Sequence, residues 1–226
     1  MKTKINYLAI ATFYLIAVGL RYLTNKTSIL DGITIGFIKV LLQGIGPAVA
    51  ALIVTLLFKI KPVLTLKGNY RDIQTPFLLY WGLPLALILG VEYVTKGTFS
   101  FVPISAVLVY GLLEEIGWRG FLQQQFKELP TFLSVILITT LWFIWHLNFE
   151  ITSSNLLFFG ILILGTWGIG KVADSTHSLL AVSAFHSLNN FFPHMNAIKM
   201  VIVIILLSAW VASLIIRKRN VQMAIG

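Results

Sequence analysis

The chain has 226 residues, of which 58% are hydrophobic and 11% are charged, and its mean hydropathy is +0.89. A soluble domain carries about 25% charged and 45–50% apolar residues, so this composition predicts an integral membrane protein. With no cysteine, the chain has no disulfide, thiol nucleophile or cysteine metal site. The net charge of +9 would fit nucleic-acid binding in a soluble protein, but here the cations lie mainly between apolar segments. We therefore expect the lipid bilayer, and not nucleic acid, as a partner.

Apolar segments of about 17–25 residues can cross a bilayer as helices. The sequence offers eight, at about 5–23, 36–58, 76–94, 104–126, 132–149, 156–172, 179–192 and 197–216. We read the first as a retained span and not as a cleaved signal. Gly44, Gly46 and Pro47 predict a kink inside the second. The predicted fold is all-α, a polytopic transmembrane bundle of about eight spans forming one domain over residues 1–226.

The lysines and arginines between these segments predict the orientation of the chain. The termini and every second loop carry eleven of them: Lys2, Lys4, Lys59, Lys61, Lys67, Arg71, Lys127, Lys171, Arg217, Lys218 and Arg219. The opposite loops carry four: Arg21, Lys26, Lys96 and Lys199. Because cytoplasmic loops are enriched in lysine and arginine, we expect a multi-pass protein of the cell membrane with both termini in the cytoplasm.

The fourth segment carries two adjacent carboxylates and an arginine at membrane depth. Ionisable groups there cost roughly 2.5–3.5 kcal/mol each on insertion scales, so they are functional candidates by default. Glu115 and Arg119 are four residues apart and share a helix face, which predicts an ion pair that supports the structure. Glu114 lies about 100° around the helix from Glu115 and is therefore free to face a cavity as a base.

Two later segments add polar groups that complete a hydrolytic set. The fifth ends near His146, and the seventh carries His186 and Asn190, one helical turn apart. A buried carboxylate can act as a general base toward water that a histidine orients. A second histidine and an asparagine amide can donate hydrogen bonds to an oxyanion. Together these groups predict acyl-group hydrolysis by activated water.

At these residues the chain resembles the CAAX-protease and bacteriocin-processing (CPBP, or Abi) family of intramembrane endopeptidases. The family has a Glu-Glu-x-x-x-Arg motif, matched by Glu114, Glu115 and Arg119. It has an aromatic residue four positions before a histidine, matched by Trp142 and His146, although that aromatic is often Phe. It also has a His-x-x-x-Asn motif, matched by His186 and Asn190. The motifs occur in the family's order, and the resemblance covers about residues 75–195.

The resemblance implies catalysis by Glu114, His146, His186 and Asn190. Glu114 would be the water-activating base, assisted by His146, while His186 and Asn190 would form the oxyanion hole. Glu115 and Arg119 would support the site structurally. The implied substrate is a peptide or membrane-associated protein, and the compact size and motif style indicate a bacterial source.

A catalytic zinc remains an alternative to a metal-free mechanism. Glu114, His146 and His186 form a two-histidine, one-glutamate set compatible with zinc. The chain has no His-Glu-x-x-His motif, and an asparagine such as Asn190 is a poor zinc ligand. We favour a glutamate mechanism with no metal and no cofactor.

Other interpretations of the same residues stay open. The chain could be a non-catalytic membrane scaffold or bacteriocin-immunity factor, or a proton-coupled transporter, although no inverted repeat supports the transporter. Packing is the expected role of Asn189 and of three tryptophans: Trp118, Trp142 and Trp145. His177 and His194 are interpreted as ordinary loop histidines.

Overall fold

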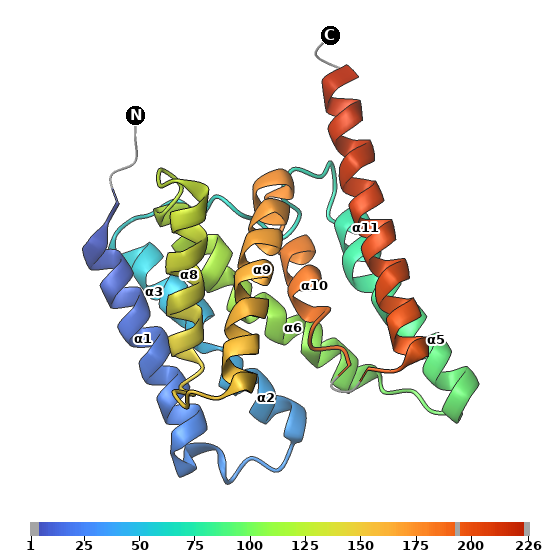
Figure 1. Cartoon of the computed structure of the whole chain (residues 1–226), viewed down its shortest axis with the longest axis horizontal. Coiled ribbons are helices and arrows are strands. Elements are labelled where there is room, and N and C mark those ends of the chain that lie inside the picture. The colour runs from blue at the N-terminus through green and yellow to red at the C-terminus, as the bar shows by residue number, and fades with distance from the viewer. Residues whose placement is uncertain (1–4, 193–194, 224–226) are drawn as a thin grey trace.

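The computed structural model describes residues 5–192 and 195–223 and is built from helices. Within those residues no β-strand occurs, and an isolated bridge joins Thr65 to Ser178. The start of α1 and the end of α11 lie at the same end of the bundle (Figure 1). The all-α prediction is confirmed. His194, interpreted above as a loop histidine, lies outside the described residues.

Five helical stretches are long and apolar enough to cross a membrane. They are Tyr7–Lys26 (α1), Gln74–Lys96 (α4, η2 and α5), Phe101–Gln125 (α6, η3 and α7), Ser153–Thr176 (α9) and Ala197–Arg219 (within α11, Ala197–Met223). A sixth is the pair α2 (Gly36–Gly44) and α3 (Gly46–Leu57), which meet at an angle of 44°. Pro47 is the second residue of α3, and the bend confirms the predicted kink.

The two remaining predicted spans form helices that are too short to cross a membrane alone. The helix α8 (Thr131–Trp145) has 15 residues, and α10 (Leu179–Ser187) has nine. At 1.5 Å per residue these lengths reach about 22 Å and 14 Å, against a hydrocarbon core of about 30 Å. Seven residues of α10 are buried, which makes it an internal helix of the bundle. The structure thus supports a multi-pass membrane protein with five spans, or six, and does not confirm the count of eight.

The helix α6 (Phe101–Gly117) lies at the centre and packs against α2, α3 and α10. On one side of the bundle α1 packs along α3, while α5 (Leu83–Lys96) and α11 lie together on the other side (Figure 1). The contact between α3 and α6 is close enough to require glycine. A Cβ atom on Gly117 would approach the Cβ of Pro47 to 2.4 Å.

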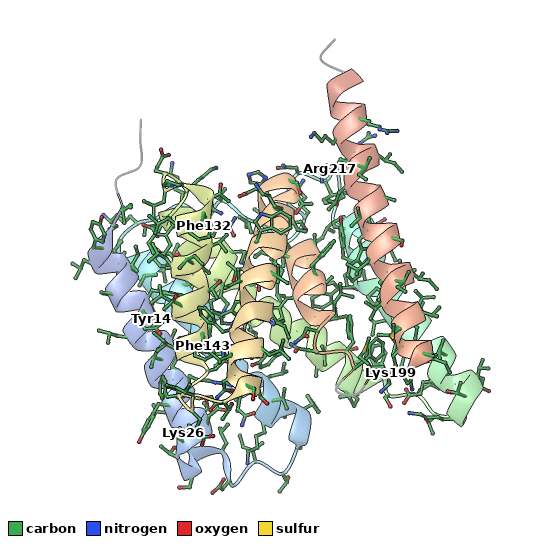
Figure 2. The ribbon with its side chains drawn as sticks, in the orientation of Figure 1. Tyr14, Lys26, Phe132, Phe143, Lys199 and Arg217 are labelled. Atoms are coloured by element: carbon green, nitrogen blue, oxygen red, sulfur yellow. The ribbon has the colours of Figure 1, made fainter. Side chains whose placement is uncertain are left out.

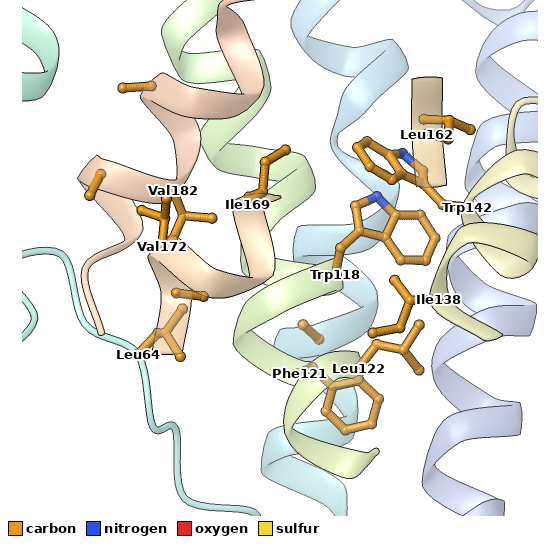
Figure 3. Close-up of a cluster of buried hydrophobic side chains, with 14 of the residues drawn as sticks. Leu64, Trp118, Phe121, Leu122, Ile138, Trp142, Leu162, Ile169, Val172 and Val182 are labelled. Carbon is orange, nitrogen blue, oxygen red and sulfur yellow. The ribbon is translucent and has the colours of Figure 1, made fainter. Parts of the chain in front are cut away.

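The helix that carries the glutamates widens into a π turn immediately after them. The turn, η3 (Trp118–Leu122), leads into the short α7 (Gln123–Gln125). A second π turn, η2 (Leu78–Gly82), lies between α4 (Gln74–Phe77) and α5, where Pro84 removes a backbone N–H. π turns are rare and occur frequently at functional sites. The turn η3 places Trp118 beside Trp142 of α8 in the apolar core (Figure 3).

The loop between α3 and α4 is fixed by backbone hydrogen bonds. A short 3₁₀ turn, η1 (Ser28–Leu30), lies earlier in the chain, between α1 and α2. Thr65 N–H donates to the His177 carbonyl at 3.0 Å, and Leu179 N–H donates to the Thr65 carbonyl at 2.9 Å. The His177 backbone is in the left-handed region at the end of α9, and its Nδ1 lies 2.9 Å from the Asn69 side-chain nitrogen. His177 is therefore part of a loop anchor that joins α9 and α10, more than an ordinary loop histidine.

Candidate active site

A cavity of about 550 Å³ lies among α6, α8, α9 and the end of α10. Its wall is largely apolar and includes Phe158 and Leu162 of α9, together with two glycines of the same helix. The polar groups on this wall include all four residues predicted to be catalytic: Glu114, His146, His186 and Asn190. The structure therefore brings together residues that are up to 76 positions apart in sequence, as Glu114 and Asn190 are.

Glu114 is held by tryptophan side chains. Its Oε2 accepts hydrogen bonds from Trp118 Nε1 at 3.2 Å and from Trp142 Nε1 at 2.8 Å. The side chain is 1% exposed, and the ion pairs among the described residues do not include it. The Tyr110 side chain is also a hydrogen-bonding neighbour of this carboxylate. Glu114 is thus fixed by neutral donors at the edge of the cavity.

Glu115 lies between two basic groups. Its Oε1 accepts from Arg119 Nη1 at 2.9 Å, so the predicted ion pair is present. The same oxygen lies 2.6 Å from His186 Nδ1, which must donate because a carboxylate oxygen accepts. All three side chains are buried. Local spacing predicted the first contact but could not predict the second, which joins residues 71 positions apart.

His146 immediately follows α8 and is oriented by the backbone. Its Nδ1 lies 2.8 Å from the Trp142 carbonyl oxygen, so Nδ1 carries the proton of that hydrogen bond. The ring packs edge-on against Trp145 and Phe158, with centroid distances of 5.2 Å and 4.9 Å. In the neutral imidazole this arrangement leaves Nε2 with a lone pair, which can accept a hydrogen bond or a proton.

The prediction that His186 and Asn190 lie on the same face of one helix is wrong, although both residues line the cavity. The helix α10 ends at Ser187, and Asn190 lies in the following turn, where its N–H donates to the Ser187 carbonyl at 2.9 Å. Asn189 also lines the cavity and is exposed, so its interpretation as a packing residue is wrong as well. The turn places both amides on the cavity wall because it breaks the 100° helical step.

Sequence reasoning missed the groups that hold the catalytic candidates. Trp118 is four residues after Glu114 on the same helix, a spacing that could have indicated its hydrogen bond. Trp142 comes from another helix and gave no such signal. Arg21 was expected in a loop but lies within α1, where Nη1 donates to the Gln43 carbonyl at 2.8 Å. Its guanidinium also lies 4.4 Å from the ring centroid of Trp145.

The proposed zinc ligands do not form a metal site in this arrangement. Among residues 5–192 and 195–223, no three histidine, cysteine, aspartate or glutamate side chains are grouped so that they could hold a metal ion. One oxygen of Glu114 is already engaged by two indole N–H groups, and His186 Nδ1 is engaged by Glu115. These residues do not fit a zinc ion as they stand, so we derive no step through one.

Comparison with known protein families gives a match over the part of the chain that carries the motifs. Residues 96–192 match the family model described as type II CAAX prenyl endopeptidase Rce1-like. No curated protein matches the chain. The matched segment is somewhat less than half of the chain and contains all three motifs and all four catalytic candidates. The resemblance predicted from those motifs is therefore confirmed over residues 96–192, which match the Rce1-like family model.

Proposed function

We propose that this protein is an intramembrane endopeptidase that hydrolyses a peptide bond of a peptide or membrane-associated protein. The observation that carries the proposal is that Glu114, His146, His186 and Asn190 line one largely apolar cavity. The Rce1-like match supports the CAAX-protease class of reaction. An apolar cavity of this size can admit part of an extended chain together with a water molecule.

Glu114 and His146 are the pair we assign to water activation. The indole N–H groups fix the Glu114 carboxylate, and the Trp142 carbonyl fixes the His146 ring. Glu114 takes one proton from the water, while the other O–H of that water donates a hydrogen bond to His146 Nε2, which orients the oxygen. The oxygen attacks the carbonyl carbon of the scissile bond. The proton then passes from Glu114 to the leaving amine nitrogen as the C–N bond breaks.

His186 and Asn190 are the donors we assign to the oxyanion. The structure holds His186 through Nδ1, so its Nε2 is the atom that would meet the oxyanion. Nε2 can donate only when the ring is doubly protonated, and Glu115 on the opposite nitrogen stabilises that imidazolium. The Asn190 side-chain amide supplies the second donor. Glu115 thus acts through His186, and Arg119 is the second cation that contacts this carboxylate.

Three further features belong to the same proposal. We infer eight membrane crossings, two of which are made by the short helices α8 and α10 together with the residues that flank them. We also infer that the shared end of α1 and α11 faces the cytoplasm, because lysine and arginine are concentrated there. The bacterial source and the metal-free reaction are inferred from the motif style and from the donors of the site.

Cleavage of a peptide library by the purified protein in detergent tests the proposal. Mass spectrometry would compare new peptide termini made by the wild type and by Glu114→Gln, each with and without a metal chelator. We expect termini only from the wild type, unaffected by the chelator. Chelator-sensitive cleavage would overturn the metal-free mechanism. Binding of peptides without cleavage by either protein would favour a scaffold or immunity factor, and proton flux in liposomes would favour a transporter.

A further inference from the structure

A second cavity, of about 400 Å³, lies between α8 and α9 and shares no wall residue with the first. It lies at the end of α8 that begins with Thr131, whereas His146 follows the other end (Figure 2, where Phe132 and Phe143 mark the two ends). This is the end of the bundle at which Arg217 of α11 also lies (Figure 2). The second cavity is therefore at the end of the bundle with the most basic loops.

Two lysines and one aspartate face this cavity. Lys127 and Lys171 line it, both are exposed, and neither takes part in an ion pair among the described residues. Asp174 also lines the wall, but it accepts a hydrogen bond from Gln123 Nε2 at 3.0 Å. The cavity therefore has an excess of positive charge, which favours an anionic ligand.

Neutral donors on the same wall add to this preference. The helix α8 begins after Pro130, which provides no side-chain cap, so the first N–H groups of the helix are left for a ligand or solvent. Thr131 and Ser134 of its first turn place hydroxyl groups on the wall. Across the cavity Thr166 is 2% exposed, and its hydroxyl has no hydrogen-bond partner among the described residues. These groups are of the kind that binds phosphate oxygens.

An apolar floor continues from the charged rim toward the middle of the bundle. Val135 and Ile138 of α8 and Trp167 of α9 line it, and the Trp167 side chain is 54% exposed. A tryptophan with apolar neighbours on one side and an exposed surface on the other is typical of the membrane–water interface. The floor fits an acyl chain and the rim fits a phosphate. A free phosphate ion would leave the apolar part of the cavity unused.

We propose that the cavity between α8 and α9 binds an anionic phospholipid, with its headgroup phosphate between Lys127 and Lys171 and an acyl chain against Trp167. Basic pockets between membrane helices bind anionic headgroups in this way. The lipid joins the two helices that carry His146 and the apolar wall of the first cavity. The inference does not depend on the proposed peptidase activity.

Thermal unfolding of delipidated protein in an uncharged detergent tests the site. Phosphatidylglycerol, phosphatidylcholine with the same acyl chains, and inorganic phosphate would be titrated separately. We expect only phosphatidylglycerol to raise the unfolding midpoint. In Lys127→Gln/Lys171→Gln the half-saturating concentration increases about 30-fold, since each lysine near an anionic lipid is worth about fivefold.

The matched control removes two cations from the same end of the protein. Lys218→Gln/Arg219→Gln alters exposed residues of α11 and should titrate like the wild type. The proposal is overturned if the Lys127/Lys171 variant titrates like this control. An equal effect of phosphatidylcholine would show that headgroup charge is not recognised, and an equal effect of inorganic phosphate would identify a free anion as the ligand.

Discussion

The two sides of α6 give neighbouring glutamates opposite surroundings. Glu115 is enclosed between Arg119 and His186, and both contacts involve the same carboxylate oxygen. Glu114, one residue earlier, accepts from two neutral indole N–H groups and borders the cavity. Both side chains are almost completely buried, so burial alone does not distinguish them.

The difference indicates how one helix can carry a structural carboxylate and a reactive one. A buried ion is tolerated when a partner of opposite charge and hydrogen bonds compensate it, and Glu115 has both. Glu114 has hydrogen bonds that fix its position, and among the described residues it has no cation at ion-pair distance, so it remains free to exchange a proton with water. We therefore assign chemistry to the Glu114 side and stability to the Glu115 side. The same change, Glu to Gln, should affect the two sides differently.

Glu114→Gln gives the largest expected effect on activity. We expect peptide cleavage to fall by about 10³-fold, since a positioned general base contributes about 10²–10⁴-fold. The thermal unfolding midpoint should change little, because the amide oxygen of Gln still accepts from Trp118 and Trp142. Initial cleavage rates and unfolding midpoints in the same detergent measure both. A variant that unfolds without losing specific activity would reverse our assignment.

Glu115→Gln should cause the largest loss of stability. The variant leaves the Arg119 guanidinium buried without its carboxylate, and breaking a buried ion pair in this way costs about 3–5 kcal/mol. Titration with a denaturing detergent would measure the free energy of unfolding. Cleavage should fall too, because His186 loses the anion at Nδ1.

A second substitution separates these two consequences. Adding Arg119→Met to Glu115→Gln removes the uncompensated cation, and we expect it to recover most of the lost stability. Cleavage should stay low, because the partner of His186 is still missing. Recovery of full activity together with stability would mean that Glu115 acts only as a counter-ion of Arg119.

Much of the fold could be predicted because the local hydropathy of the sequence identifies membrane helices. Each of the eight predicted segments corresponds to one helix or to two or three consecutive helical elements, and the kink near Pro47 was evident from the glycines and proline in the sequence. Segment length was less informative at 179–192. Its apolar residues continue beyond Ser187, but the helix ends there and a turn follows. Hydropathy shows that a residue is buried but not whether it is helical.

The candidate site was predictable only where its contacts are local. The Glu115–Arg119 pair follows from a spacing of four residues. The contacts of Glu115 with His186 and of Glu114 with Trp142 depend on how α6, α8 and α10 pack, which one sequence does not specify. Tryptophans in apolar segments were assigned to packing because nothing local distinguishes a packed indole from one that donates its N–H to a carboxylate.

Asn190→Ala tests the oxyanion donor on the Glu114 side. Removal of one such donor costs about 10²–10³-fold in kcat, and we expect a loss of about 10²-fold with little change in KM. Asn189→Ala is the matched control, since the neighbouring amide also lines the cavity but has no assigned role. Kinetics on one peptide substrate would compare the two. Equal losses in both variants would show that the turn requires its amides for its conformation and would remove Asn190 from the mechanism.

Trp142→Phe should give the smallest of these effects and shows how Glu114 is positioned. The change removes one N–H donor from Glu114 Oε2, while Trp118 still donates to that oxygen. A hydrogen bond to a charged group contributes about 1.5–3 kcal/mol, and with one donor left we expect the lower end, a decrease of about tenfold in kcat. Trp210→Phe is the control, because this buried indole donates to the Leu79 carbonyl and does not line the cavity. If both variants lose stability equally but only Trp142→Phe loses activity, the indole positions the base. If neither loses activity, Trp118 alone is sufficient, and the neutral donors matter mainly for burying Glu114.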